Sequence, residues 1–209
     1  MKRRCSAIVC VHTRDRWDTI CEAIRSLERQ ILPCDEIIIV VDHNVSLLRD
    51  LAARFPAAIL LENSQKKGLS GARNTGVEAA TSDIIAFLDD DAVAEPSWLL
   101  TALRWFDDPS VLGVASLIEP NWLAPTPRWF PDEFLWTVGC TYRGYATSGN
   151  EIRNVLGAAM IVRRDVLRQA GGFSHAVGRH GGALPISCEE TEPLHAREES
   201  QPKRPVYLR

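Results

Sequence analysis

Short apolar runs alternate with longer stretches of helical periodicity from residue 6 to residue 118, and this alternation restricts the fold more than any other feature. The segments 6–11, 36–41 and 84–88 are mostly apolar without polar alternation, as in strands covered on both faces. Between the first two segments, apolar residues recur every three or four positions, as on a helix that buries one face. The pattern predicts the α/β class, with a mostly parallel sheet and helices on both faces.

The same reasoning extends along the rest of the chain. Further helices are predicted at 47–55, 70–80, 98–106 and 163–170, and further strands at 57–61, 111–118 and 155–162. Residues 193–209 have no apolar periodicity and contain three prolines, so we predict an irregular tail there. With 209 residues, of which 45% are hydrophobic, the chain can bury a core of its own.

The composition excludes several classes of protein. The 24 Lys and Arg residues against 27 Asp and Glu residues give a net charge of -3, which argues against nucleic acid as a partner. The six cysteines occur singly, without a Cys-x-x-Cys pair, as in a reduced, cytoplasmic protein. Because no segment approaches the roughly 20 apolar residues that span a bilayer, we expect only peripheral contact with the inner face of a membrane.

Three consecutive carboxylates, Asp89, Asp90 and Asp91, directly follow the predicted strand 84–88. The carboxyl ends of parallel strands are where open α/β sheets bind ligands. Adjacent anions raise one another's pKa, so a cation or hydrogen-bond donors must compensate them. Oxygen ligands at this point suit Mg²⁺ or Mn²⁺ bridging to a phosphate. The alternative is a solvated acidic turn that caps the next helix.

A glycine-rich stretch, Gly68–Gly76, opens a predicted helix and carries Arg73 on its first turns. Helix N-termini and arginine side chains both bind anions, so this stretch is a candidate phosphate contact. It lacks the Gly-Lys-Ser/Thr ending of a P-loop. A dinucleotide-binding fingerprint would follow the first strand, whereas this stretch comes later in the chain. A tightly packed helix start is the alternative interpretation.

Polar residues also follow the first two strands, with Thr13 and Arg14 after one and Asp42 and His43 after the other. An acidic side chain at such a rim commonly binds a ribose hydroxyl or a base, although it can equally cap a helix. Farther along, aromatic residues alternate with prolines between Trp122 and Trp136. This segment is either an extra hydrophobic layer or the wall of a binding cleft.

Taken in chain order, these motifs resemble the family 2 glycosyltransferases, which are inverting enzymes with the Rossmann-like GT-A fold. The resemblance covers residues 6–192, with residues 1–118 as the nucleotide-binding half and residues 119–192 as the acceptor-side half. The segments that carry it are Val11–Arg16, Val41-Asp42, Gly71–Gly76, Phe87–Asp91, Gly157–Met160, Gly171–Phe173 and Glu189-Glu190. The implied activity transfers a sugar from a nucleotide-diphosphate sugar to an acceptor hydroxyl.

The resemblance also implies a donor site. Asp89 and Asp91 would bind the donor diphosphate through Mn²⁺ or Mg²⁺, with Asp91 as the more direct metal ligand. A divalent ion there would neutralise charge on the departing nucleoside diphosphate. The residues that would hold the nucleotide sugar are Thr13, Arg14, Asp42, Arg73, Asp89 and Asp90.

On the acceptor side, the resemblance places the catalytic base at Glu190, where the family more often has aspartate, or at its neighbour Glu189. This carboxylate would remove the proton from the acceptor hydroxyl as its oxygen attacks the anomeric carbon. Trp129, Trp136 and Gly157 would contact the acceptor, a saccharide or a lipid-linked saccharide. Without the resemblance, a charged helix start would be the favoured interpretation of the acidic pair.

The chain departs from the family after Glu192, where an amphipathic helix beginning Leu-Cys-Met-Arg is expected and Pro193–Arg197 stands instead. Removing one base from codons for this pentapeptide restores Leu-Cys-Met-Arg, so we hypothesise a truncating frame shift after Glu192. A catalytically impaired protein that only binds nucleotide sugar is therefore one alternative function. A phosphatase of the haloacid dehalogenase type is another, because Asp89–Val93 fits its Asp-x-Asp-x-Val loop.

Overall fold

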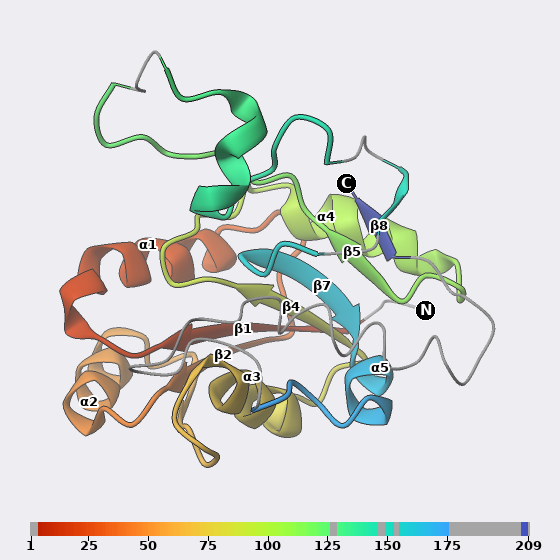
Figure 1. Ribbon diagram of the computed structural model, residues 1–209. Helices are drawn as coiled ribbons and strands as arrows, with labels where there is room; N and C mark the ends of the chain where they lie inside the picture. The colour runs from red at the N-terminus through yellow and green to blue at the C-terminus, as the bar shows by residue number, and fades with distance from the viewer. Residues whose placement is uncertain (1–3, 126–128, 146–148, 153–154, 176–205, 209) are drawn as a thin grey trace.

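A computed structural model describes residues 4–125, 129–145, 149–152, 155–175 and 206–208 (Figure 1). Its first half alternates strands and helices as predicted. The elements are β1 Cys5–Val11, α1 Trp17–Glu28, β2 Glu36–Val41, α2 Val45–Arg54, β3 Ile59–Glu62, α3 Leu69–Ala79 and β4 Ile84–Leu88, with the 3-10 helix η1 Arg14–Arg16 before α1. The α/β class and the GT-A-like layering of helices on a central sheet are confirmed.

The second half is less regular. Its described elements are α4 Trp98–Ala102, η2 Leu103–Asp107, β5 Gly113–Ala115, η3 Asp132–Val138, β6 Glu151–Ile152, β7 Ala159–Arg163, α5 Arg164–Gln169 and β8 Val206–Leu208. The helix predicted at 98–106 becomes a short α-helix that continues as a 3-10 helix, and only three residues of the strand predicted at 111–118 pair in the sheet. Apolar content therefore located these elements without fixing their lengths.

The described strands form one sheet in the order β3-β2-β1-β4-β7-β5-β8-β6. The first four are parallel neighbours, as predicted, whereas β7 runs antiparallel to both β4 and β5. The segment 193–209 was predicted to be irregular, yet β8 within it pairs with β5 and β6. Backbone hydrogen bonds to the strands on both sides can hold such a short strand without any apolar periodicity.

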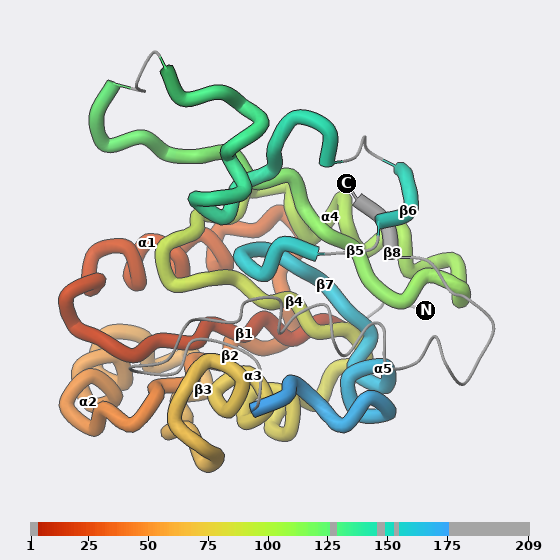
Figure 2. Tube along the Cα trace, in the orientation of Figure 1, coloured from red at the N-terminus to blue at the C-terminus, as the bar shows by residue number. Residues whose placement is uncertain are grey.

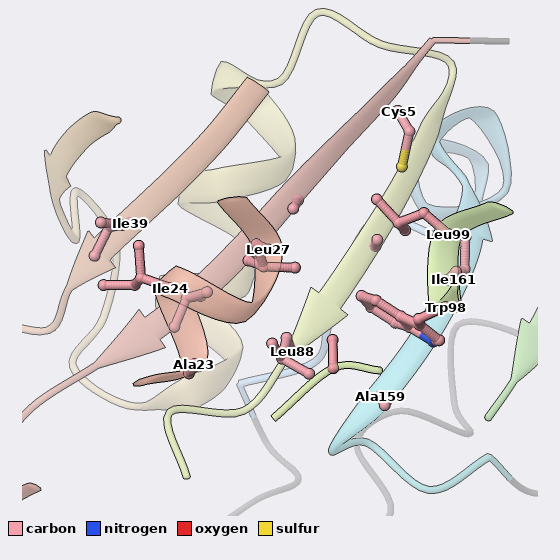
Figure 3. Packing of buried hydrophobic residues seen from close by; sticks show 14 of the residues in the cluster. Cys5, Ala23, Ile24, Leu27, Ile39, Leu88, Trp98, Leu99, Ala159 and Ile161 are labelled. Carbon is pink, nitrogen blue, oxygen red and sulfur yellow. The ribbon is translucent and has the colours of Figure 1, made fainter. Parts of the chain in front are cut away.

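Helices cover both faces of the sheet. One apolar cluster packs α1, α2 and α4 against alternate residues of the strands, among them Ala7, Val9 and Leu88. Figure 3 shows part of this cluster, with Leu27 of α1 and Trp98 of α4 on either side of Leu88. The other cluster packs α3 and α5 against the opposite face, where Ile8 and Phe87 are buried. Successive strand residues point to opposite faces, so two buried faces require the continuous apolar runs seen in the sequence.

Gly71 lies where α3 passes closest to the preceding loop. A Cβ atom at this position would stand 2.0 Å from the backbone carbonyl oxygen of Lys66. No real Cβ approaches a backbone oxygen so closely, so the helix or the loop would have to move. The glycine therefore allows α3 to start directly against the loop between β3 and the helix.

We predict that Gly71→Ala destabilises the protein by more than about 2 kcal/mol, because a backbone atom cannot move aside as a side chain can. Helix propensity alone would favour alanine by about 1 kcal/mol. Urea unfolding measures the net effect, and Ala79→Gly, at the exposed last residue of the same helix, is a control that should change the stability little. A stabilised Gly71→Ala variant would contradict the close approach.

Glu36 joins the amino-terminal ends of three strands. Its carboxylate accepts hydrogen bonds from the Ser6 hydroxyl, from the Thr81 amide at 3.0 Å and from the Thr81 hydroxyl at 2.7 Å. Burial acts to raise the pKa of Glu36, but the hydrogen bonds from Ser6 and Thr81 outweigh it and leave the pKa below its ordinary value. The ionised carboxylate therefore stabilises the folded state.

Because the folded-state pKa of Glu36 is lowered, its contribution is present above the unfolded pKa and is lost as pH falls through the folded value. We predict that Glu36→Gln lowers the free energy of unfolding by about 1 kcal/mol at neutral pH. Since Gln resembles the protonated acid, the difference should shrink with acidification. Chemical denaturation at a series of pH values tests this, and a deficit that does not change with pH would contradict it.

Candidate functional site

Three parallel strands end side by side and place the predicted polar residues on one rim of the sheet. β1 ends at Val11, β2 at Val41 and β4 at Leu88, so Thr13, Asp42 and Asp89 follow neighbouring strands. The Asp42 amide donates to the Val11 carbonyl at 2.7 Å, which continues the pairing of β1 with β2 into the loop. The carboxyl ends of these strands thus form a polar edge of the kind that binds ligands in open α/β sheets.

Arg73 lies beneath this edge rather than on its surface. Its side chain comes from α3 and the residue is only 1% exposed. Its Nη2 lies 3.4 Å from Asp89 Oδ1 and donates to the Gly157 carbonyl at 3.2 Å. The guanidinium also lies over the rings of Phe87 and Phe173, at 5.8 and 5.4 Å from their centroids. Arg73 is therefore an internal cation that fixes Asp89 and the segment before β7.

Asp90 and Asp91 share a different arginine. Arg16 Nη1 donates to Asp90 Oδ1 at 2.8 Å and to Asp91 Oδ2 at 3.1 Å. Asp90 is 6% exposed, and burial raises its pKa although Arg16 acts in the opposite direction. The sequence analysis assigned Arg73 and Arg14 to the donor site and gave Arg16 no role of its own, although three adjacent anions already indicated that other segments must supply cations.

The acidic turn can hold a metal ion only if a bound phosphate and water complete the coordination. Asp91 has a side chain that is 52% exposed, and the side chain of Asp89 is partly exposed, whereas Asp90 is buried. Among the described residues, no group of three His, Cys, Asp or Glu side chains is placed to hold a metal. Mg²⁺ is typically held by one or two carboxylates together with substrate phosphates and water, so Asp89 and Asp91 fit that arrangement.

Asp42 is already engaged by the loop that precedes α3. Its Oδ1 accepts from Asn63 Nδ2 at 2.7 Å, and its Oδ2 accepts from the Gly68 amide at 3.0 Å. The next residue, His43, has a positive φ of 52°, which turns the chain sharply after β2. Asp42 therefore holds the glycine-rich stretch in place at the rim, and its contact with a nucleotide remains a prediction.

The two other predicted donor residues lie in the loop after β1. The Thr13 hydroxyl accepts from the Asp15 amide at 3.2 Å and so caps η1. Arg14 forms an ion pair with Asp50 on α2, and its guanidinium lies 5.1 Å from the centroid of the Trp17 ring. Arg14 therefore does not compensate the acidic turn in this structure, whereas Arg16, two residues later, does.

Asn74 connects α3 to the turn after α5, a link that the sequence did not reveal. Its Oδ1 accepts from the Phe173 amide at 2.7 Å, and its Nδ2 donates to the Phe173 carbonyl at 2.9 Å. The Phe173 ring in turn packs edge-on against Phe87, with centroids 5.4 Å apart. This pairing holds Phe173 over Arg73 and thereby completes the aromatic enclosure of the guanidinium.

The aromatic segment protrudes from the sheet and carries η3 (Figure 2). Trp129 is 78% exposed and Trp136 is also largely exposed, so neither belongs to an extra buried layer. The segment returns to the sheet at Thr141, whose amide donates to the Ile118 carbonyl at 2.9 Å.

Cys140, at the carboxyl end of this segment, is buried. Burial raises the pKa of its thiol, and the charge of Asp91 adds to this effect. The predicted catalytic residues Glu189 and Glu190 lie outside the described residues, as does most of the segment after Glu192.

Among the described helices, none is long and apolar enough to cross a bilayer.

Comparison with known proteins agrees with this geometry. The model of the family "Glycosyl transferase family 2" matches residues 6–171. The glucosyl-dolichyl phosphate glucuronosyltransferase of Haloferax volcanii is 34% identical over 180 residues, which are 84% of this chain and 58% of the relative. The putative glycosyltransferase EpsH of Bacillus subtilis is 31% identical over 114 residues, or 53% of this chain and 33% of the relative.

Solved structures share the fold. The mannosyltransferase PcManGT from Pyrobaculum calidifontis, in complex with GDP-Man and Mn²⁺, has a TM-score of 0.66 at 21% identity, over 100% of this chain and 57% of that one. TarS 1–349 of S. aureus, in complex with UDP-GlcNAc, has a TM-score of 0.67 at 14% identity, over 99% and 56%. The chain thus spans little more than half the length of these proteins. With the family model matched along most of its length, the chain belongs to glycosyl transferase family 2.

Proposed function

We propose that the chain binds a nucleotide-diphosphate sugar at the rim of β1, β2 and β4 and transfers the sugar to an acceptor hydroxyl with inversion. The observation that carries this proposal is the exposed Asp91 carboxylate beside Asp89, which Arg73 fixes at the ends of parallel strands. Membership of the glycosyltransferase family supports a transferase. The proposed donors follow from relatives in complex with GDP-Man and with UDP-GlcNAc.

In this proposal, each residue of the rim has a role that follows from its position. Asp91 and Asp89 would hold Mn²⁺ or Mg²⁺, which supplies Lewis-acid stabilisation of the leaving diphosphate. Arg73 holds Asp89 in place through a charge-assisted contact between its Nη2 and Asp89 Oδ1. Thr13 and Asp42 stand on the same rim, where the nucleoside would lie. The mannosyltransferase in complex with Mn²⁺ supports a divalent ion at this type of site.

Glu190, or Glu189, would accept the proton of the acceptor hydroxyl while the hydroxyl oxygen attacks the anomeric carbon. The bond from that carbon to the diphosphate oxygen breaks in the same step, which inverts the configuration. The acceptor is proposed to be a saccharide or a lipid-linked saccharide, because the haloarchaeal relative is named for a glucosyl-dolichyl phosphate. A cytoplasmic site at the inner face of a membrane is part of this proposal.

The structure does not support the phosphatase alternative. Its aspartate loop would follow the first strand, whereas Asp89 follows β4 and is held by a buried arginine. The catalytically impaired alternative makes a different prediction, namely donor binding without turnover. Binding and turnover are therefore measured separately.

We predict that UDP or GDP binds in a Mn²⁺-dependent manner and that Asp91→Asn weakens this binding at least about tenfold, because a direct charge-assisted contact is lost. Isothermal titration calorimetry with UDP, GDP and dTDP, with and without Mn²⁺, measures it. Asp132→Asn is the matched control, since Asp132 pairs with Arg143 on the protruding segment. Binding that does not need Asp91, or no binding by the folded chain, would refute the donor site. Binding without donor hydrolysis would indicate the impaired form.

For the acceptor we predict that Trp129→Ala raises the acceptor KM about tenfold through the loss of stacking and leaves the donor KM within about twofold. Glucosyl-dolichyl phosphate serves as the trial acceptor. Leu123→Ala removes an even more exposed aliphatic side chain from the same segment and should change neither constant. Equal losses for donor and acceptor would show that Trp129 is not an acceptor contact.

A further inference from the structure

Two arginines neutralise the acidic turn, and they differ in how far they are exposed. Arg73 is buried and fixes Asp89. The side chain of Arg16 is 44% exposed and bridges Asp90 and Asp91 through one nitrogen, Nη1. A guanidinium has several N–H groups in a planar fork, so two bonds through one nitrogen do not use its full donor capacity.

The two contacts of Arg16 also differ in strength. The Asp90 side chain is buried, and its Oδ2 has no hydrogen-bond partner among the described residues, so the charge on Asp90 depends on Arg16. Removing the counter-ion of a buried carboxylate is costly. Asp91, in contrast, is half-exposed, and exposed ion pairs contribute little to stability. Arg16 is therefore anchored at Asp90 and only loosely held at Asp91.

Asp91 is the carboxylate that the proposed function assigns to the metal and diphosphate. Arg16 Nη1 lies 3.1 Å from Asp91 Oδ2, so a divalent cation bound by Asp91 would compete with the guanidinium for the same oxygen. Since Asp90 keeps the guanidinium beside the turn, its remaining donors can reach an anion that arrives with the metal. Arginine is well suited to such phosphate contacts.

We propose that Arg16 is an exchangeable ligand of the donor site: it neutralises Asp91 in the metal-free protein and turns to the diphosphate of the nucleotide sugar when Asp91 binds the metal. Throughout this exchange Arg16 remains bonded to Asp90. Only the contact between Arg16 and the diphosphate rests on the proposed function. Competition between Arg16 and a divalent cation at Asp91 does not depend on the nucleotide.

The experiment compares Arg16→Gln with the wild type for Mn²⁺ alone, by the loss of the free Mn²⁺ signal in electron paramagnetic resonance. Removing a competing positive charge should tighten Mn²⁺ binding about five- to tenfold. Arg29→Gln is the matched control, because it makes the same change in net charge at an exposed arginine that pairs with Glu22. It should leave the Mn²⁺ affinity unchanged.

The second arm measures UDP and GDP binding by calorimetry at saturating Mn²⁺. Here Arg16→Gln should weaken binding about tenfold, because a charge-assisted contact to the diphosphate is lost. Arg16→Lys separates charge from geometry: it should keep the Mn²⁺ affinity within about twofold and still weaken nucleotide binding, since lysine lacks the planar fork. For Arg16→Gln we therefore expect a higher affinity for Mn²⁺ and a lower affinity for the nucleotide.

Other outcomes overturn the inference. Weaker binding of both Mn²⁺ and nucleotide would mean that Arg16 only holds the turn together, and no change in either would mean that it has no role there. If the wild type binds Mn²⁺ but no nucleotide, the proposed function and the diphosphate contact fail together, while the Mn²⁺ arm still decides the competition. Should Arg16→Gln not fold, Arg16→Gln with Asp90→Asn removes the buried charge and its partner together.

Discussion

Electrostatic compensation of Asp89, Asp90 and Asp91 is the constraint around which the rim of this sheet is arranged. Adjacent carboxylates repel one another, and one of the three is buried, so positive charge has to be supplied by other elements. Arg73 supplies it from α3, and Arg16 supplies it from the loop between β1 and α1. Two segments that are far apart in the chain are thereby bound to the end of β4.

Burial of Arg73 has consequences of its own. A buried guanidinium is tolerated only when hydrogen bonds and a counter-ion replace its water, and Asp89 and the Gly157 carbonyl do so on one side. Phe87 and Phe173 enclose the remaining surface, and Asn74 holds Phe173 by both of its backbone groups. Helix α3 and the turn after α5 are therefore one packed unit, joined by Arg73 and by the hydrogen bonds of Asn74.

The protruding aromatic segment is the contrasting part of the molecule. Its large apolar side chains are exposed, which a core does not allow, yet its carboxyl end is anchored by hydrogen bonds between Thr141 and Ile118. Exposed aromatic surface of this kind is typical of sites that stack on a sugar or contact an apolar chain. In the proposed function, the rigidly packed rim would bind the donor and the exposed apolar segment would contact the acceptor.

Most of the first half of the fold, the acidic turn and the glycine-rich start of α3 were determined by the sequence alone, because periodicity and strand-end motifs depend on residues that are close neighbours in the chain. Only the tertiary structure decided that β7 lies between β4 and β5, that β8 joins the sheet, and that Arg16 rather than Arg14 neutralises the acidic turn. It also decided that Arg73 is enclosed rather than exposed. These outcomes depend on pairing and packing between segments remote in the chain, and no local pattern encodes which partner a strand or a charge will find.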